Sequence, residues 1–147
     1  SAEAVEHLSQ ARRLSPLDPW AWVPNTLLAN AYIGLKDYVQ ALHYSRLGAS
    51  QAPHVVTPHI VVATASVGLG QMELAADAMT QAVRVGPEFL HKRLQLLEAG
   101  LPLSETMQRR LHLMLTAVRL VDRSLMSAPL RDLLGRLDGL QVPHLGP

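Results

Sequence analysis

The sequence of 147 residues contains no cysteine, so it carries no disulfide, no thiol nucleophile and no thiolate metal ligand. Aromatic residues make up only 4% of the chain and charged residues only 17%, and the formal net charge at pH 7 is +1. Such a charge offers no electrostatic attraction to nucleic acid or to an anionic membrane. The longest uncharged stretches are interrupted by Pro, Gly, Asn and Gln, so neither predicts a membrane span.

Hydrophobic residues make up 48% of the chain, and most of them are Leu and Ala. Residues of this kind favour helices, whereas sheets are typically rich in β-branched and aromatic residues. The length fits one domain with a core of its own. The composition therefore predicts a single all-α domain.

The sequence contains two copies of one pattern, offset by 34 residues. Small residues recur at fixed steps in both copies, and a proline closes each of them. The equivalent pairs are Tyr38 and Met72, Ala41 and Ala75, Ser45 and Met79, Gly48 and Ala82, and Pro53 and Pro87. A weaker copy with the same internal steps lies 37 residues upstream of the first, at Ala4, Leu8, Ala11 and Pro16. A period of this length predicts stacked helical units.

This period, with its small residues and closing proline, resembles the tetratricopeptide repeat. The spacing makes physical sense, because only small side chains such as Ala41, Ala75 and Ala82 let two helix backbones nearly touch. The closing proline ends a helix, since it cannot continue the hydrogen-bond ladder. The resemblance implies an α-α superhelix of stacked antiparallel helical hairpins, with two extra helices at the C-terminal end.

Apolar periodicity, caps and turn residues predict eight helices. Their expected ranges are 2–14, 18–35, 38–50, 57–68, 72–85, 87–99, 104–123 and 129–140. Asp18, Thr57 and Ser104 are the expected N-caps, and Pro24 should kink the second helix or delay its start. The expected units are a half repeat at 1–17, full repeats at about 19–55 and 56–89, an end helix at 87–100, C-terminal capping or dimerisation helices at 103–141 and a frayed tail at 142–147.

The stretch from Leu14 to Trp22 and the turn from Lys36 to Leu42 look like the C-terminal tetratricopeptide segment of bacterial nucleotide cyclases and winged-helix transcriptional regulators. The exit from Leu97 to Pro102 is similar to the end of such a segment. The first repeat lacks its first helix, which would leave an apolar face uncovered. We therefore expect the chain to be excised from a longer protein, or a partner to cover that face.

The sequence contains no motif for catalysis or metal binding. Its seven histidines are scattered, without an HExxH motif or an i,i+4 pair. Arg109, Arg110, Arg119 and Arg123 form a basic flank on one expected helix, but no aromatic residue lies among them, as a nucleic-acid interface would require. The sequence thus predicts a protein that is not an enzyme, with no cofactor, no metal and no nucleic-acid or membrane partner.

Binding is then expected in the concave groove that the first helices of stacked hairpins line. The expected groove residues are Val23, Thr26, Asn30, Ile33, Thr57, Ile60, Thr64 and Val67. Neither the segment 19–35 nor the segment 53–72 contains a charged residue apart from its flanks. Since only Asn30 could hold a peptide carboxylate, we do not expect the carboxylate clamp of chaperone-type family members. Either the chain's own C-terminal helices or an apolar partner helix should cover this uncharged face.

The helix expected at 104–123 carries apolar residues on more of its circumference than one contact requires. The residues expected to mediate self-association are Met107, Leu111, Leu113, Met114, Val118 and Leu120. A two-fold contact between copies would bury Leu113 and Leu120 and bring Met114 near the axis. The alternative is that the C-terminal helices cap the repeats within one chain.

These observations favour a non-catalytic, cytoplasmic protein–protein interaction scaffold from a bacterium, within a larger signalling or regulatory protein. Its partner would be a protein or peptide that places an apolar helix in the groove, and a homodimer would form through the C-terminal helices. A second hypothesis is a regulatory or linker fragment of a nucleotide-cyclase-like enzyme whose catalytic domain lies upstream of Ser1.

Overall fold

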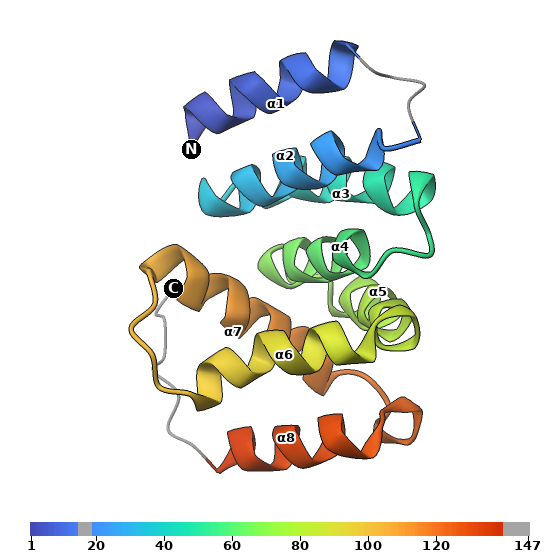
Figure 1. Ribbon diagram of the computed structural model, residues 1–147, viewed down its shortest axis with the longest axis vertical. Coiled ribbons are helices and arrows are strands. Elements are labelled where there is room, and N and C mark those ends of the chain that lie inside the picture. The colour runs from blue at the N-terminus through green and yellow to red at the C-terminus, as the bar shows by residue number, and fades with distance from the viewer. Residues whose placement is uncertain (15–18, 140–147) are drawn as a thin grey trace.

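A computed structural model describes residues 1–14 and 19–139, and in these residues it is entirely helical, with no strand (Figure 1). The all-α prediction is therefore confirmed. The elements are α1 (Ala2–Leu14), α2 (Trp22–Gly34), α3 (Tyr38–Gln51), α4 (Val56–Gly68), α5 (Met72–Val85), α6 (Pro87–Glu98), α7 (Glu105–Arg119), a short 3-10 helix (Arg123–Leu125) and α8 (Ala128–Asp138).

The first five helices stack in chain order along the long axis of the molecule (Figure 1). Helix α1 packs on α2, α2 pairs with α3, α3 packs on α4, and α4 pairs with α5. Each bound of the α4/α5 hairpin lies 34 residues after the corresponding bound of the α2/α3 hairpin. The sequence period and the helix boundaries therefore coincide.

The turns inside the two hairpins have the same hydrogen bonds. The N–H of Asp37 donates to the carbonyl of Tyr32 at 2.9 Å, and the N–H of Gln71 donates to the carbonyl of Ser66 at 2.8 Å. This is the six-to-one bond that closes a helix C-terminus when the preceding residue is left-handed. That residue is Gly70 (φ 75°) in the second turn but Lys36 (φ 60°) in the first, and a lysine is strained there.

Small residues lie where the helices approach one another most closely. Ala41, Ala75 and Ala82 are fully buried, as the spacing predicted. A Cβ placed on Gly48 of α3 would lie 2.6 Å from Thr26 Oγ1 of α2, so no side chain fits there. The hairpins can therefore pair closely only with small residues at these positions.

The helix predictions were right in kind but wrong at several N-termini. Helix α2 begins at Trp22, four residues later than expected, and Pro24 lies in its first turn, where its missing N–H leaves no bond unmade. The expected cap Asp18 lies outside the described residues. Thr57 is not a cap, because α4 begins at Val56 with Val55 at the cap position.

The predicted C-terminal helices occur, with one correction. Ser104 caps α7 as predicted, since its side chain accepts a hydrogen bond from the N–H of Met107 at 3.1 Å. The helix ends at Arg119 rather than near Arg123, and the short 3-10 helix follows it. Ser127 caps α8. The expected end of α8 at Leu140 and the expected frayed tail lie outside the described residues.

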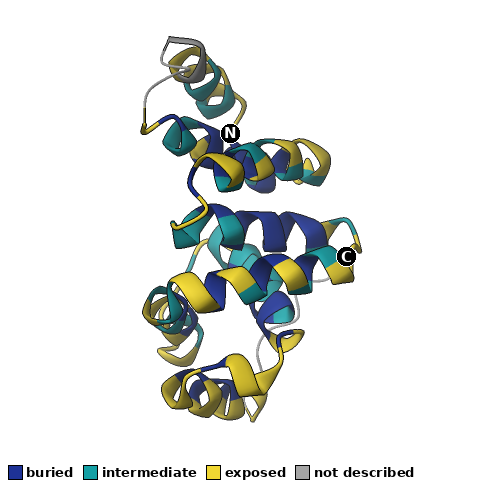
Figure 2. Cartoon of the chain, turned by 90° about the vertical axis from the view of Figure 1, so that its right-hand side faces the viewer, coloured by how far each residue is buried: buried dark blue, intermediate teal, exposed yellow. Residues whose placement is uncertain are grey.

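The three C-terminal helices leave the regular stack. Helix α7 lies against α4 and α5, while α8 packs on α6 (Figure 1). The largest group of buried apolar residues extends through α4, α5, α6, α7 and α8. Figure 2 shows this buried material along the middle of the molecule, with exposed residues on the outer surfaces. None of the helices within 1–14 and 19–139 combines the length and apolar character needed to cross a membrane.

Candidate functional site

Helix α7 covers one face of α4. Ile60 of α4 is 6% exposed, and Leu111 and Met114 of α7 are 1% and 5% exposed, all in the same apolar core. Helix α4 itself carries no charged residue. Of the two ways to cover an uncharged helix, the chain thus uses its own C-terminal segment at α4.

Two arginines fasten α7 to the C-terminal end of α2. The Nη2 atom of Arg109 donates to the carbonyls of Ile33 at 3.3 Å and Gly34 at 3.0 Å. The Nη2 atom of Arg110 donates to the carbonyl of Asn30 at 2.8 Å. The last carbonyls of a helix have no partner within it and carry partial negative charge. Since α2 has no basic residue in its own last turn, α7 supplies these donors from elsewhere in the chain.

A cavity of about 80 Å³ lies where α2, α4, α6 and α7 meet. Its apolar walls include Ile60 of α4 and Met107, Leu111 and Met114 of α7. We call it the α7 cavity. A cavity with apolar walls and a few polar groups is the usual form of a small-molecule site.

The polar groups of the α7 cavity are mainly cationic. Arg110 of α7 and Arg93 of α6 both line it, together with Asn30. The Nε atom of Arg110 is buried without a hydrogen-bond partner. Burial lowers the pKa of Arg110, and repulsion from Arg109 and Arg93 lowers it further. The site therefore concentrates positive charge in a partly desolvated place.

No carboxylate in the described part of the chain forms an ion pair with Arg93 or Arg110. The guanidinium carbon of Arg93 lies 5.1 Å from the centre of the Phe89 ring, which holds this side chain at the rim. The ion pairs of Arg119 and Arg123 with Asp138, and of Arg136 with Glu98, involve other surfaces. The α7 cavity thus keeps its charge uncompensated by these residues.

The structure gathers some of the expected groove residues at this cavity and places others elsewhere. Asn30, Thr57, Ile60 and Thr64 line it. Thr26 instead faces α3 at Gly48, and its hydroxyl donates to the carbonyl of Trp22 at 2.7 Å. Ile33 is fully buried in a second apolar cluster. Val23 and Val67 are half-buried.

The residues expected to mediate self-association are mostly inside the chain. Leu111, Met114 and Val118 are buried in the main core, and Met107 packs against it. Leu113 packs against the second cluster, which Ala29, Ile33, Ala41, Val61 and Ala65 form. Leu120 is 42% exposed, so it is the member of the set that a second copy could reach.

Sequence reasoning missed Arg93 and Leu27 as surface features of this region. Leu27 of α2 is 48% exposed although it lies within an uncharged helix. Arg110 was noted only as part of a basic flank. Its contact with Asn30 joins residues 80 positions apart, so no local pattern could have revealed it.

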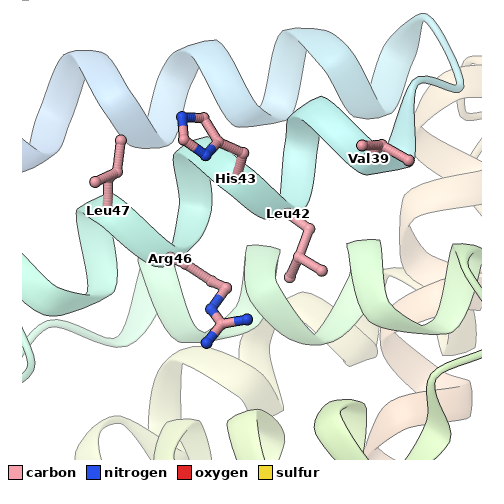
Figure 3. A pocket seen from close by; sticks show the side chains of 5 residues that line it. All are labelled: Val39, Leu42, His43, Arg46 and Leu47. Carbon is pink, nitrogen blue, oxygen red and sulfur yellow. The ribbon is translucent and has the colours of Figure 1, made fainter.

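A second hollow, of about 400 Å³, lies on α3 (Figure 3). It is lined by residues of this helix alone: Val39, Leu42, His43, Arg46 and Leu47. The His43 ring meets the Tyr44 ring edge-on, with centroids 4.8 Å apart. The lining contains no carboxylate or hydroxyl to act with His43, so it forms no acid–base pair.

Within the described ranges, no group of three His, Asp or Glu side chains is placed to hold a metal ion. Comparisons with protein-family models, with curated proteins and with solved structures find no match. The function must therefore be argued from the geometry of the chain itself.

Proposed function

We propose that this chain is a non-catalytic protein–protein interaction scaffold built on tetratricopeptide-like hairpins, and that it serves within a larger signalling or regulatory protein. One observation carries the proposal: two successive helical hairpins have bounds 34 residues apart and turns with the same hydrogen bonds. Helical units that repeat in this way stack on their neighbours and present long surfaces to partners.

The partner's contact is assigned to α2 rather than to α4. Helix α7 covers α4, but it reaches only the C-terminal part of α2 through Arg109 and Arg110. Val23 and Leu27 lie four residues apart, and so on one face of α2. Val23 is half-buried and Leu27 is 48% exposed. An apolar helix laid beside α7 would bury this face, as helix-in-groove complexes do.

Substituting Leu27 tests this assignment. The immobilised chain is exposed to an extract of the source cells, and retained proteins are compared between the wild type, Leu27→Asp and Leu35→Asp. Leu35 is a matched control, because it is 45% exposed but lies beyond the end of α2. We expect a protein that the wild type and Leu35→Asp retain and Leu27→Asp loses. Equal retention by Leu27→Asp, with unchanged melting temperature, would contradict the assignment.

We also propose that a homodimer would form through the C-terminal helices at Leu120. The exposed Leu125 follows it in the 3-10 helix, which widens the apolar surface. Light scattering at micromolar concentration should give twice the chain mass of 16.1 kDa, and Leu120→Asp should return the chain to that mass. A monomeric wild type would reject the dimer.

A further inference from the structure

We propose that the α7 cavity binds a small organic anion, namely a carboxylate carried on a short apolar chain. This inference does not depend on the proposed scaffold function. It rests on three features of the cavity: two arginines without an acidic partner in the described residues, apolar walls, and a limited volume.

The charge of the cavity favours an anion. A guanidinium withdrawn from water is costly unless it is paired and hydrogen-bonded. Arg110 uses its Nη2 on the carbonyl of Asn30, while its Nε is buried without an acceptor. Arg93 adds a second cation at the rim. A carboxylate can accept from two guanidinium donors at once, and such charge-assisted bonds are about twice as strong as neutral ones.

The walls of the cavity favour an apolar body behind the charge. Ile60, Met107, Leu111 and Met114 offer no hydrogen bond to a hydrated ion. The hydroxyl of Thr64 already donates to the carbonyl of Val61 at 3.0 Å. An inorganic phosphate would lose its hydration against these walls without compensation, whereas an alkyl chain would gain from the same burial.

The volume limits the length of the chain. One water-sized probe occupies about 10–15 Å³, so the cavity of about 80 Å³ accommodates roughly five to eight non-hydrogen atoms. Pentanoate falls in this range. The rest of the argument therefore uses pentanoate as the probe.

The experiment is calorimetric titration of the full chain at constant ionic strength with sodium pentanoate, with the neutral pentanamide and with inorganic phosphate. We expect pentanoate to bind at least about tenfold more tightly than pentanamide, since a hydrogen bond to a charged group contributes at least as much as a tenfold change in affinity requires. Phosphate should bind more weakly than pentanoate. Pentanoate should also raise the melting temperature as its concentration rises.

Variants at the rim connect the binding to the arginines. Replacing Arg110 could detach α7 from α2, so the informative variant is Arg93→Gln, which removes a charge from an exposed side chain. It should weaken pentanoate about tenfold. The matched control is Arg84→Gln, an exposed arginine of α5 that does not line the cavity, and it should leave the affinity unchanged.

Four results would overturn the proposal. Equal binding of pentanamide would show that charge plays no part, and equal binding of phosphate would show that the apolar walls play none. An unchanged affinity in Arg93→Gln would place the anion elsewhere. Binding of a peptide that ends in a free apolar residue, without binding of pentanoate, would assign the cavity to a protein partner instead of a small acid.

Discussion

Truncating Leu111 to alanine measures how firmly α7 is held in the groove. Leu111 is 1% exposed and lies in the core that α7 shares with Ile60 of α4. A buried Leu→Ala change costs about 2–5 kcal/mol, and the cost rises with the volume that neighbouring atoms fail to refill. Because the α7 cavity already adjoins Leu111, few atoms are near enough to close the gap. We therefore expect a loss of about 3–4 kcal/mol.

Leu120→Ala is the matched control, because it removes the same atoms from the end of the same helix. Leu120 is 42% exposed, so its truncation should cost less than about 1 kcal/mol. Urea denaturation followed by circular dichroism at 222 nm gives both free energies of unfolding. The expected loss at Leu111 is a large part of the stability of a typical domain, which is about 5–15 kcal/mol.

An equal and small loss in the two variants would refute the packing of α7 on α4. It would mean that the face of α4 is open in solution, and that an apolar partner could enter the groove there. Ile60→Asp gives the same distinction from the other side. It should lower the melting temperature sharply if α7 covers Ile60, and leave it unchanged if the groove is open.

Three further changes test local features. Lys36→Gly should stabilise the chain by about 1 kcal/mol and Gly70→Ala should destabilise it by a similar amount, because both positions have a left-handed backbone; differential scanning calorimetry decides, and an opposite sign at Lys36 would refute the turn geometry. Ser104→Ala should cost about 1 kcal/mol in urea unfolding through loss of the α7 cap, whereas no change would mean that the cap is dispensable. Ala75→Leu should cost about 1–3 kcal/mol by overpacking, and a neutral result would place Ala75 away from a close contact.

Local chemistry made most helices predictable. Helices α1 and α5 have the predicted bounds, and Ser104 caps α7 as predicted. Apolar periodicity, capping side chains and turn residues each act within a few positions of the chain, so a single sequence contains them. The burial of Ala41 and Ala75 was predictable for a related reason, since the 34-residue period marks equivalent contacts.

The facing of individual groove residues was less predictable. Helices α2 and α4 are uncharged, so no alternation of polar and apolar residues marks which side meets a neighbour. Thr26 was expected in the groove but meets Gly48 of α3, while Asn30, four residues on, lies at the cavity. A rotation of less than half a turn of α2 separates these outcomes.

The sequence by itself determined that this chain is helical, where its hairpins begin and end, and which small residues lie between them. Only the tertiary structure decided that α7 returns across α4 and brings Arg110 to Asn30. The expectation that only Asn30 could meet a carboxylate considered the helices that line the groove and not the helix that covers it. Helix propensity and capping depend on neighbours in sequence, whereas the docking of α7 depends on which apolar faces remain uncovered after the hairpins have formed.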